Sequence, residues 1–265
     1  MEGELVGCKE HDHNIEDIVK DYRASCGTEC KLFENAVFEE LFDGSIRPGG
    51  SHLTQRAMEL CHFSEGAKIL DVGCGYGTTV EFLQSNYHVD AVGIDLSTTI
   101  LERGKARNPN LNLLYGDAEM LDFPSLSFDG IFMECVLSLA DNLTETLHEA
   151  YCVLKKGGKL VVSDFYIKDG EKINTENQGG SKNCLDGAFV PEELKTALTE
   201  MGFKILSWED KNKELRDFTA ALIMHYGSLD AFFGSVLQEG EDKSFFTGIE
   251  NYKKLGYFLL IAEKE

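Results

Sequence analysis

The stretch of sequence that decides the fold is Asp71-Val72-Gly73-Cys74-Gly75-Tyr76-Gly77. An apolar run over residues 68–72 leads into it, and a segment with helical periodicity, residues 78–85, follows it. A strand therefore turns into a helix through a loop of glycines. Glycines at such a turn let the chain reverse sharply and let a ligand lie against the backbone. The stretch predicts a ligand-binding loop at the end of a buried strand, although one G-x-G-x-G motif is a weak signal by itself.

Short apolar runs alternate with helical segments on both sides of this loop. The predicted strands cover residues 68–72, 89–94, 111–115, 130–133 and 159–162, and the predicted helices cover residues 78–85, 97–107 and 143–154. Strands that alternate with helices form βαβ units, which build a parallel sheet covered on both faces. The sequence therefore predicts an α/β fold with a Rossmann-like, mostly parallel sheet and helices on both faces.

Further elements flank this alternating region. Ser51 is placed to cap a helix that runs to about residue 62, after a break at residues 48–50. A polar stretch at residues 168–183 reads as a long loop, which is typical of a functional or a disordered segment. Beyond it we expect a helix from Pro191 to about residue 201, a strand at 203–209, a helix at 213–226 and a last strand at 257–261.

The charge balance limits the classes of partner. The chain has 25 Lys and Arg against 46 Asp and Glu, a formal net charge of −21. Nucleic acids and anionic membrane surfaces are bound by Lys and Arg, so we expect neither as a partner. The sequence has no apolar run of about 18 residues and no basic, apolar start, which predicts a cytoplasmic protein without a membrane span. Its eight cysteines are then expected to be thiols. The oligomeric state is left open.

Two acidic residues follow the next two predicted strands. Asp95 ends the second strand, where a carboxylate can bind both hydroxyls of a ribose. Asp117 follows the third strand, where a carboxylate can accept a hydrogen bond from an adenine amino group. Asp71 lies where the pyrophosphate of a dinucleotide would need donors, and Thr78 replaces the third glycine of the dinucleotide motif. The loop therefore favours an adenosine ligand with a cationic or zwitterionic tail over a nicotinamide dinucleotide.

The glycine loop, Asp95 and the Gly116-Asp117-Ala118 step together resemble the class I S-adenosylmethionine-dependent methyltransferases. The resemblance covers residues 50–165, and the last strand fits the reversed, antiparallel β-hairpin of that family. It implies S-adenosylmethionine as the cofactor, with Asp71 orienting the methionine part and Asp95 holding the ribose. The positions that it assigns to the cofactor are Asp71, Gly73, Cys74, Gly75, Asp95, Leu96, Asp117, Ala118 and Glu134.

The sequence pattern also divides the chain into two regions, because residues 1–50 differ from the rest. Residues 1–50 are expected to form an N-terminal helical cap, and residues 51–265 are expected to form the methyltransferase domain. Within that domain the cofactor-binding core is expected over residues 66–165. The substrate-side loop and helices are expected over residues 166–256.

Two cysteines point to a methyl acceptor. The phrases Met133-Glu134-Cys135-Val136-Leu137-Ser138-Leu139 and Cys184-Leu185-Asp186-Gly187-Ala188-Phe189 resemble the arsenite methyltransferases, whose matching cysteines bind trivalent arsenic. The resemblance implies Cys135 and Cys184 as thiolate ligands of a thiophilic centre. The chain departs from that family because Glu134 replaces an Asn, Asp186 replaces a Gly, and the cysteine upstream of the glycine loop is missing. Whether Cys26 or Cys30 supplies that thiolate is left open.

Two alternatives remain beside the thiophilic acceptor. In the first, the acceptor is an organic molecule with a nucleophilic oxygen, nitrogen or sulfur, the cysteines are incidental, and Glu134 or His52 is the general base. In the second, the chain binds S-adenosylmethionine without catalysis and docks a partner protein. The motif Cys8-x-x-His11-x-His13 has residue types that bind metals, but it matches no closed four-ligand pattern, and we interpret it as part of an acidic tail.

Overall fold

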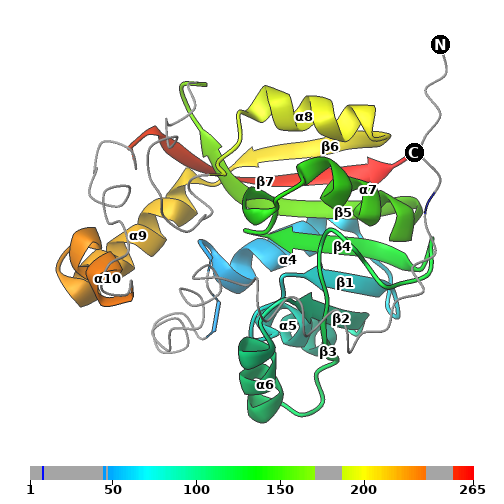
Figure 1. The fold of residues 1–265 in the computed structure, drawn as a ribbon, viewed down its shortest axis with the longest axis horizontal. Coiled ribbons are helices and arrows are strands. Elements are labelled where there is room, and N and C mark those ends of the chain that lie inside the picture. Colours follow the sequence, from blue (N-terminus) through cyan, green and yellow to red (C-terminus); the bar gives the residue numbers. More distant parts are fainter. Residues whose placement is uncertain (1–7, 9–43, 46, 171–186, 237–252) are drawn as a thin grey trace.

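The computed structural model describes residues 8, 44–45, 47–170, 187–236 and 253–265 (Figure 1). Its centre is a seven-stranded sheet with the order β3-β2-β1-β4-β5-β7-β6. The strands are β1 (Lys68–Val72), β2 (Asp90–Asp95), β3 (Leu113–Tyr115), β4 (Phe128–Glu134), β5 (Leu154–Ile167), β6 (Phe203–Asp210) and β7 (Leu255–Lys264).

The direction of the strands confirms the predicted sheet. Strands β1 to β5 pair in parallel, and β7 lies antiparallel between β5 and β6. The helices are α4 (Gly50–Cys61), α5 (Thr78–Tyr87), α6 (Thr98–Arg107), α7 (Leu143–Val153), α8 (Pro191–Glu200), α9 (Asn212–Tyr226) and α10 (Leu229–Val236). The α/β, Rossmann-like fold with an antiparallel last strand is therefore confirmed.

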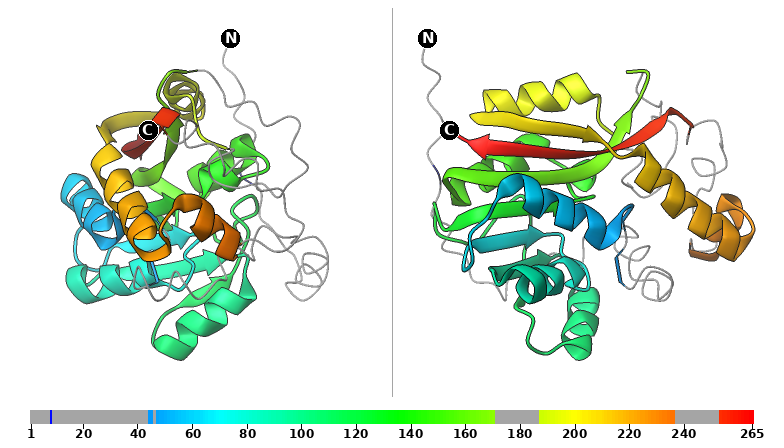
Figure 2. Two further views of the ribbon diagram at one scale, coloured as in Figure 1. Left: turned by 90° about the vertical axis from the view of Figure 1, so that its left-hand side faces the viewer. Right: turned by 180° about the vertical axis from the view of Figure 1, so that it is seen from behind.

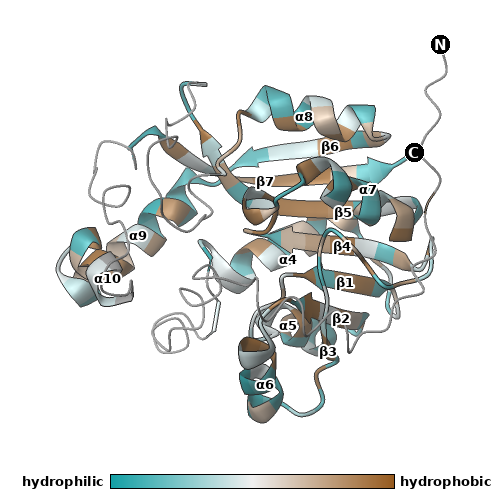
Figure 3. Ribbon diagram, viewed as in Figure 1, coloured by the Kyte–Doolittle hydropathy of each residue, from teal (hydrophilic) through white to brown (hydrophobic). Residues whose placement is uncertain are grey.

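Alternate residues of the strands build two apolar cores, one on each face. Ile69 and Val161 point into a core with residues of α4, α5 and α9, whereas Leu70 and Val162 point into a core with residues of α7 and α8. Figure 2 shows these helices on opposite faces of the sheet, and Figure 3 shows that its central strands are mostly hydrophobic. Because both faces are covered, the strands read as continuous apolar runs and not as an alternating pattern.

Several predicted boundaries are corrected by the structure. The helix expected from Ser51 begins at Gly50, and its N-cap is Gly49 in the left-handed conformation with φ 82°. Only glycine fits there, because a Cβ on Gly49 would lie 2.5 Å from Cγ of Leu53. The helix predicted at residues 143–154 is α7, which ends at Val153. Strand β5 begins at the next residue, Leu154, which pairs with Phe128. Helix α10 was not predicted from the sequence.

The expectation that the cysteines are thiols is wrong for one pair. Cys8 and Cys152 form a disulfide that spans 144 residues of sequence. Cys61, Cys74 and Cys135 are thiols. This pairing was not predictable, because nothing in the spacing of Cys8 and Cys152 brings them together. No helix in the described part of the chain is long and apolar enough to cross a membrane.

The predicted cap at residues 1–50 lies mostly outside the described residues, so the division at residue 50 stays a prediction. Gly44, Ser45 and Arg47 are described, and all three line the same cavity as residues of the core. The described part of this segment therefore packs against the cofactor-binding region.

A lysine near the end of β7 joins this strand by hydrogen bonds to the end of α7. Lys264 is buried, and its Nζ donates to the carbonyls of Tyr151, at 2.6 Å, and Leu154, at 2.9 Å. The same Nζ lies 4.2 Å from the ring centroid of Tyr151. It thus satisfies carbonyls at the point where α7 ends and β5 begins.

We expect Lys264→Met to destabilise the protein by about 1–3 kcal/mol, because it removes the lysine donor from one buried and one partly buried carbonyl. Urea unfolding measures the change in the free energy of unfolding. Lys254→Met is the matched control, since Lys254 is exposed. Equal losses in both variants would contradict a fastening role for Lys264.

Candidate active site

A cavity of about 350 Å³ opens at the carboxyl ends of β1, β2 and β4. The sheet order reverses between β1 and β4, and such a reversal is where open α/β sheets bind ligands. All predicted cofactor positions line this cavity: Asp71, Gly73, Cys74, Gly75, Asp95, Leu96, Asp117, Ala118 and Glu134. The structure therefore brings together residues that are up to 63 positions apart in the sequence.

The glycine loop has a shape that other residues cannot adopt. Gly73 has φ 68°, and a Cβ there would lie 2.4 Å from Cγ2 of Val136. Asp95 fixes the loop, because its Oδ2 accepts from the backbone N–H of Gly75 at 2.9 Å and its Oδ1 accepts from that of Ser97 at 2.9 Å. The carboxylate of Asp95 thus positions the glycine loop, and its role in binding a ribose stays a prediction.

A buried group of charges lies at the inner end of the cavity. Nη2 of Arg47 lies 2.8 Å from Oε2 of Glu134 and 2.5 Å from Oγ1 of Thr54, and Thr79 donates to the same Oε2 at 2.8 Å. The side chains of Arg47 and Glu134 are only 7 % and 5 % exposed. Arg47 carried no signal in the sequence, because a single arginine before Pro48-Gly49-Gly50 has no motif around it.

Burial also changes the acidity of the two carboxyl groups in this group. It raises the pKa of Asp71 well above its usual range, and the neighbouring charge of Glu134 raises it further. Burial raises the pKa of Glu134 as well, although the Arg47 guanidinium partly offsets the effect. Both acids therefore favour a ligand that brings positive charge into the cavity.

Three atoms of this group are buried without a hydrogen-bond partner among the described residues. They are Nη1 of Arg47, Oδ2 of Asp71 and Oε1 of Glu134. One is a cationic donor and two are carboxylate acceptors, and all three residues line the cavity. The amino-acid end of S-adenosylmethionine carries one carboxylate and one ammonium, which match a guanidinium donor and carboxylate acceptors. The donor set therefore fits this cofactor.

A turn that follows β3 forms the side of the cavity where the sequence predicts the adenine. Oδ1 of Asp117 accepts from the backbone N–H of Glu119 at 2.9 Å, which holds the turn closed. Behind it, Oε2 of Glu149 in α7 accepts from the backbone N–H of Leu121 at 2.8 Å. The position of Asp117 and Ala118 is thus set partly by a buried side chain of α7.

The predicted acceptor residues are only partly described. Cys135 lines the cavity and has φ 58°, and its Sγ lies 3.1 Å from the hydroxyl of Tyr257. Tyr257 in turn donates to Oγ of Ser163 at 3.2 Å. Cys184, Cys26 and Cys30 lie outside the described residues. Their approach to Cys135 therefore stays a prediction.

The two predicted bases differ in their surroundings. His52 is exposed on α4 and does not line the cavity, so the structure does not place it as a base. Glu134 lines the cavity, but one of its oxygens is bound to Arg47 and Thr79. This arrangement suits a group that holds the cofactor better than a group that takes up a proton from the acceptor.

Comparisons with known proteins agree with this geometry. A family model described as "Methyltransferase domain" matches residues 70–162. An O-methyltransferase of Pyrenophora dematioidea is 27% identical over 232 residues, which cover 83% of this chain and 83% of that protein. The chain is a class I S-adenosylmethionine-dependent methyltransferase.

Two further proteins resemble this methyltransferase. Phosphoethanolamine N-methyltransferase 1 of Zea mays is 26% identical over 78% of this chain, although the match covers only 38% of that relative. The solved structure of phosphoethanolamine N-methyltransferase 2 of Haemonchus contortus, in complex with S-adenosyl-L-methionine, has a TM-score of 0.66 and 19% identity. It covers 88% of this chain and 56% of that chain, and it shows the same fold.

The methyltransferase has a second wall beyond Cys135, formed by a short 3-10 helix, η1 (Leu137–Leu139). Val136, Leu139 and Ala140 line the cavity from this segment. Asp164 holds it, because its Oδ2 accepts from the backbone N–H of Ser138 at 3.0 Å, while its Oδ1 accepts from that of Phe165 at 2.8 Å. Asp164 is fully buried, and burial raises its pKa to about 6.

We expect the stability of the methyltransferase to depend on the ionisation of Asp164. Its folded pKa of about 6 lies above the unfolded value of about 4, so its contribution is fully present below pH 4 and is lost as the pH rises through 6. The free energy of unfolding, relative to Asp164→Asn, should fall by roughly 3 kcal/mol over that window. Urea unfolding at several pH values measures it, with Asp122→Asn as the control on an exposed aspartate. Parallel pH profiles for the parent and Asp164→Asn would contradict it.

We expect Arg47→Met to weaken S-adenosylmethionine binding by about 10- to 100-fold, because it removes a buried, charged donor for the carboxylate. Calorimetric titration measures the affinity. 5′-Methylthioadenosine lacks the amino-acid end, so its affinity should stay within a few-fold in the same variant. The control Arg56→Met removes a surface ion pair with Glu209 and should leave both affinities unchanged. Equal loss for both ligands in Arg47→Met would refute a carboxylate contact.

Proposed function

We propose that this methyltransferase transfers the methyl group of S-adenosylmethionine to a nucleophilic oxygen or nitrogen of a small organic molecule. The observation that carries the proposal is the division of the cavity into two walls. One wall holds the buried charges of Arg47, Asp71 and Glu134, which match the cofactor. The other wall holds Val136, Leu139 and Ala140, which offer an apolar surface to an acceptor.

When bound, the cofactor supplies a sulfonium methyl group that an acceptor lone pair attacks in line. The residues of the chain provide position, since holding two reactants close and aligned accounts for much of the rate of such a transfer. Arg47, Asp71 and Glu134 hold the amino-acid end, and Asp95 holds the ribose. Asp117 and Ala118 contact the adenine. The acceptor lies against Cys135 and the η1 segment, at the end of β4.

The relatives support an organic acceptor over a metalloid, because their printed names are those of O- and N-methyltransferases. Sγ of Cys135 lies 3.1 Å from the hydroxyl of Tyr257, and either atom can be the donor in this contact. A thiol loses its proton when it binds a soft centre, so this contact does not decide between the two acceptors.

A panel of acceptors tests the proposal with one measurement. We expect transfer of a radiolabelled methyl group to at least one phenol, carboxylic acid or amine, and none to trivalent arsenic in the presence of a thiol reductant. Cys135→Ser should retain transfer to the organic acceptor within about tenfold, because serine keeps a donor to Tyr257.

The same panel contains the contrary result. Methylation of arsenite that is lost in both Cys135→Ser and Cys184→Ser would favour the thiophilic acceptor that the sequence suggests. Cofactor binding without transfer to any acceptor would argue against the organic acceptor.

A further inference from the structure

A second group of reactive side chains lies away from the cofactor cavity, at helix α7 and the cysteine bonded to it. Cys152 near the end of the helix forms the disulfide with Cys8. One helical turn earlier, Nε2 of His148 lies 3.7 Å from Sγ of Cys152. Two sulfur atoms and one imidazole nitrogen therefore lie together. None of these three residues lines the cofactor cavity.

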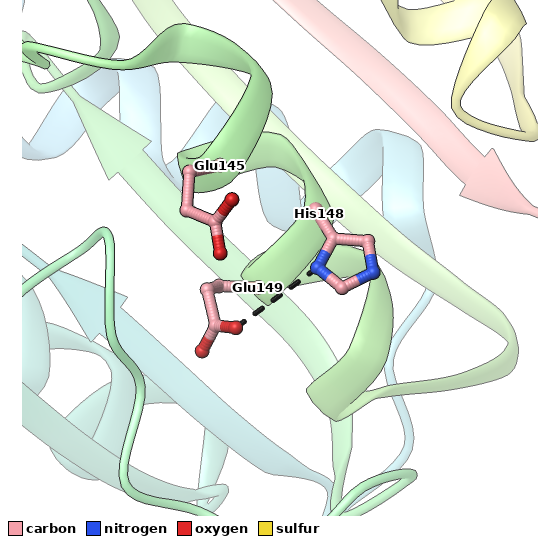
Figure 4. A group of neighbouring side chains, drawn as sticks. All are labelled: Glu145, His148 and Glu149. Carbon is pink, nitrogen blue, oxygen red and sulfur yellow. Dashed lines mark ion pairs between the residues drawn. The ribbon is translucent and has the colours of Figure 1, made fainter. Parts of the chain in front are cut away.

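The other ring nitrogen of His148 faces carboxylates. Its Nδ1 lies 4.0 Å from Oε1 of Glu149, and ligand atoms of Glu145, His148 and Glu149 all lie within 4.8 Å of one another (Figure 4). A histidine that binds a metal typically presents its second nitrogen to a carboxylate, which fixes the tautomer and orients the ring. Glu149 is itself fixed by the backbone N–H of Leu121. At 4.0 Å the contact between His148 and Glu149 is an ion-pair distance and not a hydrogen bond, so Glu149 places a negative charge near Nδ1 while Nε2 faces Cys152.

We propose that Cys8, Cys152 and His148 form a Zn²⁺ site when the disulfide is reduced. Zinc prefers a ligand set of two thiolates and one imidazole, whereas hard cations such as Mg²⁺ prefer oxygen ligands. With Zn–S and Zn–N bonds of 2.3 and 2.0–2.1 Å, the sulfur and nitrogen ligands of a tetrahedral ion lie about 3.6 Å apart. The observed separation of 3.7 Å between Cys152 and His148 matches this edge. A water molecule or a carboxylate oxygen completes the fourth position.

The disulfide is converted into the zinc site in two steps, and atoms and electrons balance in each. A dithiol reductant gives two electrons and two protons to the disulfide, which becomes two thiols while the reductant becomes a disulfide. Zn²⁺ then displaces both thiol protons and binds the two thiolates, so two protons are released. The reduced sulfurs need to separate to about 3.8 Å, the distance between two thiolates on a tetrahedral zinc ion. Cys8 is exposed, so a reductant can reach the bond.

In the reduced protein, the zinc ion thus links Cys8 to Cys152 where the disulfide links them in the oxidised protein. In either state the N-terminal segment stays attached to α7, and Glu149 of α7 supports the turn that carries Asp117 and Ala118. The inference does not rest on the proposed acceptor.

Titration of the full-length reduced protein with Co²⁺, followed by displacement with Zn²⁺, tests the site. We expect one Co²⁺ per chain with the intense visible bands of tetrahedral cobalt and a sulfur-to-cobalt charge-transfer band. Zn²⁺ should displace it, and competition with a chromophoric chelator should give a dissociation constant below 1 μM, an order-of-magnitude figure well within the range of Cys and His zinc sites. The disulfide form should bind no cobalt with these bands.

Matched variants decide which residues are ligands. Cys8→Ser should lower the zinc affinity by at least 100-fold, and it leaves the buried core untouched because Cys8 is exposed. His148→Asn should lower it by at least tenfold, and Glu149→Gln by about 10- to 100-fold. Cys61→Ser and the triple variant Cys26→Ser, Cys30→Ser, Cys184→Ser are controls that should keep the parent affinity and spectrum.

Three results would overturn the proposal. The first is a reduced parent protein that does not compete with the chelator for zinc. The second is Cys8→Ser with the affinity and spectrum of the parent. The third is cobalt binding that is equal in the oxidised and reduced proteins and is lost in Glu145→Gln, since this would assign the metal to the carboxylates and His148 alone.

Discussion

The ion pair between Arg47 and Glu134 is the interaction on which the cofactor cavity depends. Two charges out of contact with water are tolerated only if they are paired and hydrogen-bonded. Thr54 of α4 and Thr79 of α5 supply these bonds, so the pair joins two helices, the end of β4 and the segment before α4. The requirement to neutralise one buried charge thus fixes four separate segments around one point. Among the described residues, Nη1 of Arg47 and Oε1 of Glu134 keep no hydrogen-bond partner, and both residues line the cavity.

Carboxylates serve a second purpose around the cavity, because they fasten its loops. Each of four acidic side chains accepts a hydrogen bond from a backbone N–H of a loop that borders the cavity or supports it. The four are Asp95 to the glycine loop, Asp117 and Glu149 to the turn after β3, and Asp164 to the η1 segment. Hydrogen bonds to a charged acceptor are stronger than those between neutral groups. Part of the acidic excess therefore has a structural role at the site, beyond solvation of the surface.

The sequence was sufficient for the fold and for placing the predicted cofactor residues around one cavity. The order of strands and helices follows from apolar runs and turn residues that are local in the chain, and the acids that follow each strand inherit their position from the sheet. Arg47 was not predictable, because its role depends on contacts with residues 54, 79 and 134, which no local pattern reports.

The errors in the sequence-based predictions have the same cause. The disulfide between Cys8 and Cys152 is a contact across 144 residues, and an inference from composition and compartment argued against it. The N-cap of α4 was assigned to Ser51 by residue preference, whereas close packing against Leu53 selects Gly49. Cys135 lines the cavity, and its contact with Tyr257 on the last strand was not predictable from the sequence.

The position of β7 has a consequence for the order in which the chain matures. In the sheet β7 lies between β5 and β6, although it follows both in the sequence. During synthesis β6 has no strand to pair with, and β5 keeps an open edge, until residues 255–264 have emerged. An open strand edge is a template for pairing with another chain. The nascent methyltransferase therefore exposes the open edge of β5 until β7 has been synthesised. The insertion of β7 between β5 and β6 then covers this edge.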